Sequence, residues 1–217
     1  FLDQPNSSRK QHKKAIPRFG GVGFVFTIFI TLLATNTYTD VSSWYFVGAF
    51  LIWILGALDD SLNLNWYIKL PTQLLVGVVL FIATTSHLNS LSMFSDIQVG
   101  TLSYFLLLFV WIFWFLGMVN AVNLCDGLDG LAAGLVVLSL LGVSAFGLST
   151  FHLIIASALG GFLVFNKYPA KLYMGDSGSL FLGYHLATVP LIYFTSKPSL
   201  SFDLIAYLIM NTYFIWD

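Results

Sequence analysis

The sequence contains no glutamate, only one cysteine and few charged residues of either sign. Charged side chains make up 9% of the chain and hydrophobic residues 58%, whereas a soluble domain is about one quarter charged. These values exclude an ordinary soluble domain and indicate an integral membrane protein. No basic stripe interleaved with aromatic residues suggests a nucleic-acid partner. Cys125 has no second cysteine for a disulfide or a cysteine-based metal site.

The hydrophobic residues form eight runs, each about long enough to cross a bilayer when its flanks are included. They lie at roughly Gly21–Thr35, Trp44–Leu58, Leu70–Thr85, Leu102–Val122, Leu131–Leu148, Phe151–Phe165, Leu180–Phe194 and Phe202–Trp216. No soluble domain or long linker separates them. We therefore expect an all-α, polytopic transmembrane helical bundle of about eight spans, forming a single domain over residues 1–217.

Placing the spans alternately across a membrane separates the charges. One side then receives Arg9, Lys10, Lys13, Lys14, Arg18, Lys69, Lys167 and Lys171, and the other only Lys197. By the positive-inside rule the first side is cytoplasmic, and residues 1–20 form a cytoplasmic basic segment. The same alternation sends Asp59, Asp60, Asp126, Asp129 and Asp176 to that side. This segregation predicts an active face in the cytosol.

The pair Asp59-Asp60 ends the second run. Two adjacent carboxylates oppose the negative end of a helix dipole, and a cation would relieve that conflict. Mg²⁺ is commonly bound by one or two carboxylates together with substrate phosphates, although a solvated loop pair is an alternative. Lys69 begins the next run and could either meet a phosphate or extend its ammonium group to the interface.

A second polar stretch, from Asn120 to Gly130, joins two long apolar runs. Asn120, Asn123 and Asp126 would share one face at the end of a helix, while Asp129 is placed to cap the next helix. Capping does not explain Asn120 and Asn123, which lie more than a turn before Asp129, at the end of the preceding apolar run. Polar groups near lipid are costly unless they are partnered, so we assign this stretch a function.

A third stretch, Gly175 to Ser179, leads into the seventh run and could present backbone N–H groups to a phosphate. Asp176 could instead be a helix cap or a metal ligand. Tyr173 could stack on a base or lie at the membrane interface. His185, inside the run, is expected to be buried and hydrogen-bonded to a neighbouring helix.

Together these residues suit a pyrophosphate substrate bound through Mg²⁺, because phosphoryl transfer depends mainly on positioning and charge neutralisation. A site at the rim of a membrane bundle further suggests that one substrate is a membrane lipid.

These residues give the sequence its resemblance to the polyprenyl-phosphate N-acetylhexosamine-1-phosphate transferases, glycosyltransferase family 4. The matching patterns are Asp3-x-Pro5, Arg9-Lys10-x-His12, Pro17-Arg18-x-Gly20-Gly21, Asp59-Asp60 with Lys69, Asn120 to Leu131, and Asn166 to Ser179. They cover nearly the whole chain and are very specific. The second and third patterns look more like the branch that uses UDP-N-acetylglucosamine than the branch that transfers phospho-N-acetylmuramoyl-pentapeptide.

The resemblance implies that undecaprenyl phosphate attacks the sugar-bearing phosphorus of a UDP-N-acetylhexosamine and releases UMP, starting a lipid-linked cell-envelope polysaccharide. It implies Mg²⁺ as the cofactor, with Mn²⁺ as a substitute, and a bacterial inner membrane in which membrane lipids are further partners. It allows a homodimer, for which the sequence shows no interface signature.

The resemblance also implies roles for individual residues. Asp176 would ligate Mg²⁺, and Asp59 and Asp60 would handle the metal or the lipid phosphate. One of the two is a candidate base, although a phosphate monoester that is already mostly ionised at neutral pH hardly needs one. The catalytic set is Asp59, Asp60, Asp126 and Asp176. The substrate-binding set is Lys69, Asn120, Asn123, Gly127, Leu128, Asp129, Asn166 and Tyr173. Within it, Gly127, Leu128 and Asp129 would recognise uracil, assisted by Asn166 and by stacking of Tyr173. Asn123, together with Asp126, would contact the phosphates or order the metal site.

Three alternatives remain at this point: the muramoyl-pentapeptide transferase, a catalytically inactive lipid-binding relative, and a cation-coupled transporter. Transporter sites usually lie near the membrane midplane, whereas the acids here lie at the ends of the runs. The chain starts without methionine at Phe1 and ends at Asp217 directly after an apolar run. We therefore expect it to be a piece of a longer protein, which in this family continues into a loop with a His-x-His-His-like motif.

Overall fold

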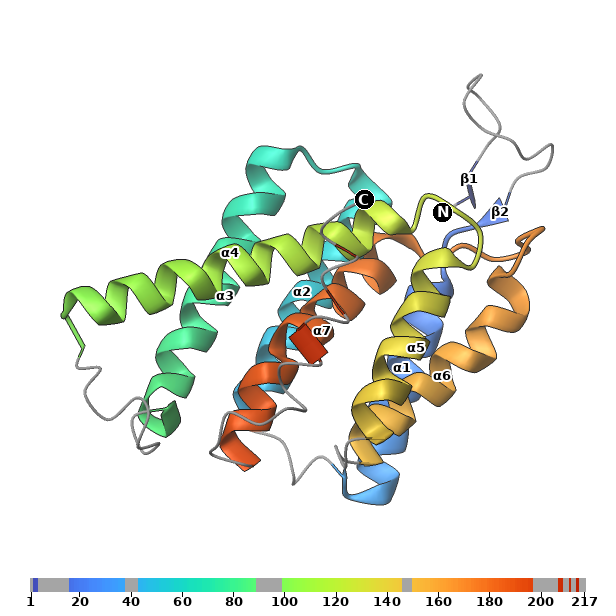
Figure 1. Ribbon diagram of the computed structural model, residues 1–217. Coiled ribbons are helices and arrows are strands. Elements are labelled where there is room, and N and C mark those ends of the chain that lie inside the picture. Colours follow the sequence, from blue (N-terminus) through green and yellow to red (C-terminus); the bar gives the residue numbers. More distant parts are fainter. Residues whose placement is uncertain are drawn as a thin grey trace.

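The computed structural model describes residues 2–3, 16–37, 43–88, 99–145 and 150–196, together with 207, 208, 211 and 214. This part contains the helices α1 (Gly20–Thr35), α2 (Ser43–Leu62), α3 (Trp66–Leu88), α4 (Leu102–Cys125), α5 (Leu131–Ala145), α6 (Thr150–Asn166) and α7 (Gly175–Ser196) (Figure 1). The helical bundle is thus confirmed. Two short strands, β1 (Leu2–Asp3) and β2 (Ile16–Pro17), pair antiparallel within the basic segment and were not predicted.

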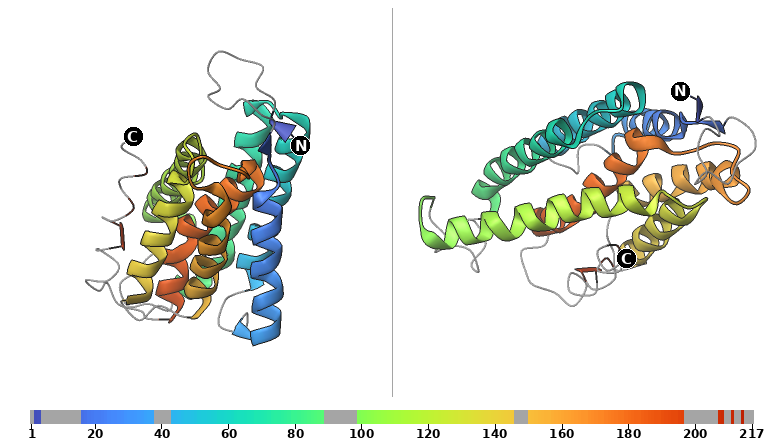
Figure 2. Two further views of the ribbon diagram at one scale, coloured as in Figure 1. Left: turned by 90° about the vertical axis from the view of Figure 1, so that its right-hand side faces the viewer. Right: turned by 90° about the horizontal axis from the view of Figure 1, so that it is seen from above.

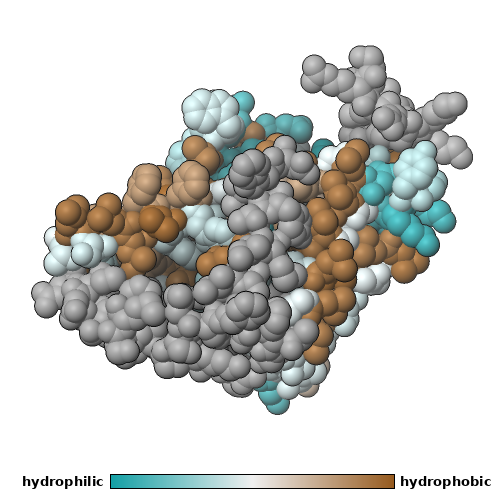
Figure 3. All heavy atoms as spheres, viewed as in Figure 1, coloured by the Kyte–Doolittle hydropathy of each residue, from teal (hydrophilic) through white to brown (hydrophobic). Residues whose placement is uncertain are grey.

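Several helices are suited to cross a membrane. In the described part of the chain, α2, α4 and the first 19 residues of α3 are both long and apolar enough, while α1, α5 and α6 are apolar but shorter. Large apolar side chains such as Phe105, Phe109 and Phe113 are exposed on α4, and Figure 3 shows hydrophobic atoms along this helix. Such a surface suits lipid rather than water. The expected eighth span, Phe202–Trp216, lies largely outside the described residues.

Helix α7 occupies the centre of the bundle. It packs mainly against α2 and α4 (Figures 1 and 2), and every residue from 177 to 191 is buried. Because protein rather than lipid surrounds it, α7 can carry serine, threonine, histidine and tyrosine side chains that a lipid-facing helix would expose at a cost. This explains why α7 is absent from the apolar span candidates although the helix is 22 residues long.

Close packing and buried hydrogen bonds hold α7 in place. A Cβ atom added at Gly183 would lie 2.6 Å from the Cα of Val119, so only glycine admits α4 at this distance. The Tyr184 hydroxyl donates to the backbone oxygen of Tyr45 at 2.8 Å. His185 is buried and its Nδ1 lies 2.8 Å from the Tyr45 hydroxyl on α2. The expected structural role of His185 is therefore confirmed.

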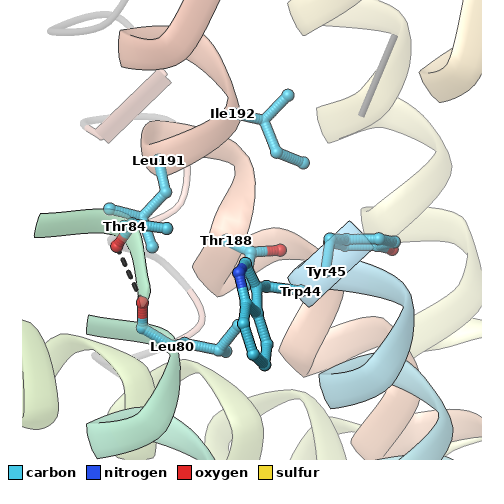
Figure 4. A pocket seen from close by; sticks show the side chains of 7 residues that line it. All are labelled: Trp44, Tyr45, Leu80, Thr84, Thr188, Leu191 and Ile192. Carbon is cyan, nitrogen blue, oxygen red and sulfur yellow. Dashed lines mark hydrogen bonds between the residues drawn. The ribbon is translucent and has the colours of Figure 1, made fainter. Parts of the chain in front are cut away.

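A small apolar hollow lies between α2, α3 and α7, lined among others by Trp44, Leu80 and Leu191 (Figure 4). The Thr84 hydroxyl at its wall donates to the backbone oxygen of Leu80 at 2.8 Å. Trp44 lies in the first turn of α2 and Asp59 in its last turn, so the hollow is at the opposite end of that helix from Asp59. It is therefore not the place where the predicted polar residues meet.

Candidate active site

The predicted acidic residues converge where α2 ends and where α3 and α7 begin. Asp59 lies in the last turn of α2, Lys69 in the first turn of α3 and Asp176 in the first turn of α7. The chain turns between α2 and α3 at Asn63, which has a left-handed φ of 48°. The Asp59 Oδ1 accepts the Leu64 backbone N–H at 2.6 Å and fixes this turn. The turn thereby directs Lys69 back toward Asp59.

Lys69 bridges two carboxylates that come from different helices. Its Nζ lies 2.6 Å from Asp59 Oδ2 and 3.3 Å from Asp176 Oδ2. Residues 59, 69 and 176 thus form one charged cluster, as their sequence patterns predicted. Such a cluster presents one ammonium group and two carboxylates at the rim of the bundle.

Asp60 points to the first turn of α7 and serves there as a cap. Its Oδ1 accepts the Asp176 backbone N–H at 2.8 Å, and its Oδ2 accepts the Ser177 N–H at 3.0 Å. These are two of the backbone groups that the sequence offered to a phosphate, so in this structure Asp60 takes that contact. Gly175 precedes them with a φ of +74°, and a Cβ there would lie 2.6 Å from Asp60 Oδ2.

Glycines bring the start of α7 close to its neighbours. A Cβ at Gly56 of α2 would lie 2.4 Å from the Asp176 carbonyl oxygen, and one at Gly21 of α1 would lie 2.2 Å from the Gly178 nitrogen. The Gly21 N–H also donates to the Met174 oxygen at 2.7 Å. The position of Asp176 is therefore set by backbone contacts on two sides.

The two asparagines of α4 contact different helices. Asn123 Nδ2 donates to the Ser179 hydroxyl of α7 at 2.8 Å. Asn120 Nδ2 donates to Gln73 Oε1 of α3 at 2.8 Å and to the Leu116 backbone oxygen. Only Asn123 therefore reaches the start of α7, and Asn120 joins α4 to α3. Neither the role of Gln73 nor that of the Ser179 hydroxyl was predicted from the sequence, although Gln73 is conspicuous as an amide inside an apolar run.

Asp129 and Asn166 join two loops beside the charged cluster. Asp129 Oδ2 accepts the Ala170 N–H at 2.8 Å, a contact other than the expected cap of α5. Asn166 is buried; its Oδ1 accepts the Gly130 N–H at 3.1 Å and its Nδ2 donates to the Leu172 oxygen at 3.0 Å. Gly127 and Leu128 are exposed between these contacts. The loop before α5 is thus fixed to the segment between α6 and α7.

Asp126 follows α4 as its C-terminal cap, and Tyr173 contacts the start of α1. The Tyr173 backbone accepts the Gly20 N–H at 3.0 Å and donates to the Pro17 oxygen at 2.9 Å, and its side chain is half-buried. Burial, with a smaller contribution from the negative charge of Asp176, raises the pKa of the Asp126 carboxyl to about 8. Crowding of carboxylates therefore extends from the charged cluster to the end of α4.

The described residues contain no group of three or more histidine, cysteine or acidic side chains arranged to hold a metal ion. They do provide Asp59 and Asp176 with a shared cation position, now held by the Lys69 ammonium. Mg²⁺ commonly takes only one or two protein carboxylates and completes its shell with phosphate oxygens and water. The donor set therefore fits a magnesium ion that is shared with a phosphorylated substrate.

Comparison with known proteins gives consistent relationships. A sequence profile of glycosyl transferase family 4 matches residues 42–194. The chain is 38% identical over 203 residues to the probable undecaprenyl-phosphate N-acetylglucosaminyl 1-phosphate transferase of Bacillus subtilis, covering 88% of this chain and 55% of the relative. It is 36% identical over 194 residues to the undecaprenyl-phosphate alpha-N-acetylglucosaminyl 1-phosphate transferase of Thermotoga maritima, covering 89% of this chain and 57% of the relative.

A third relative carries a different name. The phospho-N-acetylmuramoyl-pentapeptide-transferase of Listeria monocytogenes is 34% identical over 212 residues, covering 84% of this chain and 63% of the relative. The chain thus spans between about half and two thirds of the length of these relatives. The profile match extends from the start of α2 to the end of α7 and includes the whole charged cluster. On these grounds the chain belongs to glycosyl transferase family 4.

Proposed function

We propose that this protein transfers N-acetylglucosamine 1-phosphate from UDP-N-acetylglucosamine to undecaprenyl phosphate and releases UMP. The convergence of Asp59, Asp176 and Lys69 at one end of a helical bundle carries the proposal. The names of the Bacillus and Thermotoga relatives support N-acetylglucosamine 1-phosphate as the transferred group and undecaprenyl phosphate as the acceptor.

The chemistry requires little beyond bringing two phosphates together. The attacking phosphate monoester is already mostly ionised at neutral pH, because its second pKa is about 6, so no protein base is needed. When bound, Mg²⁺ would neutralise charge on the two phosphates, held by Asp59 and Asp176. Lys69 supplies a second positive charge next to this pair of carboxylates, and Asp60 positions Asp176 through the backbone of α7.

The two joined loops are suited to receive the nucleotide. Gly127 and Leu128 are exposed, whereas the Asp129 and Asn166 side chains form hydrogen bonds that join the loop before α5 to the segment between α6 and α7. We therefore assign uracil recognition to the loop surface and to Tyr173, and assign Asp129 and Asn166 a positioning role in it. Asn123, bonded to Ser179, lies on the path from this loop to Asp176.

The charged rim is proposed to face the cytosol of a bacterium, where nucleotide sugars are made. Lys69, Lys167 and Lys171 lie at or near this rim, and the positive-inside rule places such loops on the cytoplasmic side. The lipid acceptor would reach the rim from within the inner membrane. The acids lie at helix ends here, which favours a transferase over a transporter with a midplane ion site.

The proposal is tested with membranes that contain the full-length protein. Undecaprenyl phosphate, Mg²⁺ and UDP-N-acetylglucosamine are supplied, and UMP release is followed together with sugar label in the lipid. Both products should appear, and each should require lipid and Mg²⁺. Because the Listeria relative is named for the other donor, UDP-N-acetylmuramoyl-pentapeptide is tested in parallel. Turnover of that donor alone would overturn the assignment of N-acetylglucosamine.

A further inference from the structure

Lys69 occupies a position between two carboxylates that a divalent cation would also need. Its Nζ lies 2.6 Å from Asp59 Oδ2 and 3.3 Å from Asp176 Oδ2. The exposed fraction is 7% for the Asp59 side chain, 19% for that of Asp176 and 27% for that of Lys69. The ammonium group therefore closes a largely buried carboxylate pair while its own side chain stays partly open to solvent.

The backbone gives the two carboxylates little freedom to separate. Asp59 is tied to the turn after α2 through the Leu64 N–H, at 2.6 Å. Asp176 is held by the bond from its N–H to Asp60 and by the contact of its backbone with Gly56. Like charges fixed this close repel one another unless a cation lies between them. Lys69 supplies that cation in the structure.

A magnesium ion bound at these oxygens would compete with the ammonium group. Mg²⁺ requires its ligand oxygens at about 2.0–2.1 Å in near-octahedral geometry, and its two positive charges would repel an ammonium group bound to the same carboxylate oxygens. The lysine side chain has a flexible four-carbon stem, and the partial exposure of Lys69 gives it a direction in which to move.

We propose that Lys69 is a stand-in cation: it neutralises Asp59 and Asp176 when no divalent ion is present, and the ion displaces it toward the substrate phosphates. This inference rests on the proposed function for the destination of the ammonium group, but the displacement itself requires only the cation. When the metal ion binds, the Lys69 ammonium group thereby becomes available to contact the diphosphate of the substrate.

The displacement is tested by acetylating the full-length protein in detergent and quantifying each lysine by mass spectrometry. Mg²⁺ is added without any substrate. Lys69 should be labelled several-fold faster with Mg²⁺ than with a chelator, because its amine leaves a shielded ion pair. Exposed Lys171 is the matched control and should be labelled at the same rate in both conditions. An unchanged or slower rate at Lys69 would overturn the proposal.

Cation affinity gives a second, independent readout. Mn²⁺ binding is measured by electron paramagnetic resonance in the wild type, Lys69→Met, Lys69→Arg and Lys171→Met. Lys69→Met should bind Mn²⁺ about tenfold more tightly because its competitor is gone, and its thermal stability should fall with chelator and recover with Mg²⁺. Lys69→Arg keeps the competing charge and should bind Mn²⁺ much as the wild type does. Equal or weaker binding by Lys69→Met would contradict the proposal.

These outcomes can be told apart from a failure of the proposed function. If no nucleotide sugar is turned over but Mg²⁺ still accelerates Lys69 labelling, the stand-in role holds and the transferase assignment fails. If UMP is released in a Mg²⁺-dependent way but Lys69 labelling is unaffected, the assignment holds and the stand-in role fails.

Discussion

Among single residues, Asp60 differs most from the role that its sequence pattern suggested. It adjoins Asp59, and the pair resembles a metal-binding couple. Both Asp60 oxygens nevertheless accept backbone N–H groups of α7, from Asp176 and Ser177. The two neighbouring residues therefore have different roles. Asp59 contacts the cation position, and Asp60 holds the first turn of α7, which carries Asp176.

Substitution of Asp60 separates positioning from metal binding. Asp60→Asn keeps one acceptor oxygen, whereas Asp60→Ala removes the acceptor of both part-buried N–H groups, at a cost of up to about 1–3 kcal/mol for each. Thermal unfolding should therefore show a graded loss, with Asp60→Ala less stable than Asp60→Asn, and Mn²⁺ binding should weaken in the same order. Abolished Mn²⁺ binding with wild-type stability in Asp60→Asn would identify Asp60 as a ligand instead.

Asp126 predicts a pH dependence of stability in the absence of divalent cations. Burial raises its pKa from 3.8 to about 8, so between these values the folded protein keeps a proton that the unfolded chain releases. Stability must then fall as the pH rises through this window. The melting temperature of wild-type protein in chelator should drop from pH 5 to pH 8, and Asp126→Asn should flatten that slope. The same slope in both proteins would contradict the role of Asp126.

At the scale of elements, the site depends on how closely α7 approaches α2. A Cβ at Gly56 would lie 2.4 Å from the Asp176 carbonyl oxygen, whereas one at Gly23 of α1 would meet nothing within 4 Å. Both glycines are inside helices, so the intrinsic helix preference for alanine is the same in both. A comparison of Gly56→Ala with Gly23→Ala therefore isolates the effect of the close contact between α2 and α7.

Gly56→Ala should separate α2 from α7 and disturb the Asp59–Asp176 pair. We expect a loss of turnover of at least about tenfold, with destabilisation of about 1–3 kcal/mol from overpacking. Gly23→Ala should be neutral or slightly stabilising, with unchanged turnover. UMP release and thermal unfolding of the two variants check this, and full activity of Gly56→Ala would show that the spacing is unimportant.

For the whole molecule, the orientation in the membrane can be measured with single cysteines in a Cys125→Ala background. Tyr168 lies in the loop after α6 and Val99 precedes α4 at the opposite end of the bundle, and both are exposed. An impermeant thiol reagent applied to intact cells should label Val99→Cys and leave Tyr168→Cys unlabelled until the membrane is opened. The reverse pattern would place the charged rim outside. A cysteine in place of Ser177 would not react with the reagent from either side, because this side chain is fully buried.

The sequence predicted the helices well because long apolar runs are a direct consequence of lipid as a solvent. It also predicted that Asp59, Lys69 and Asp176 meet, since alternating spans send all of them to one side. It did not predict that α7 is central, because hydropathy alone does not distinguish a helix surrounded by protein from a helix surrounded by lipid. The contacts of Asn120 with Gln73, of Asp129 with Ala170 and of Asn166 with Gly130 were missed for another reason. These partners are side chains or backbone groups of distant segments, which no local spacing identifies.

Turnover by Asp176→Asn tests the central claim most directly, namely that the carboxylates joined by Lys69 form a catalytic centre. The substitution is nearly isosteric, and its backbone bond to Asp60 is retained. Loss of one charge-stabilising contact typically lowers turnover by about 10²–10³. We therefore expect UMP release from UDP-N-acetylglucosamine to fall at least that far, with an elution profile and a melting temperature close to wild type. Wild-type turnover by folded Asp176→Asn would contradict the account.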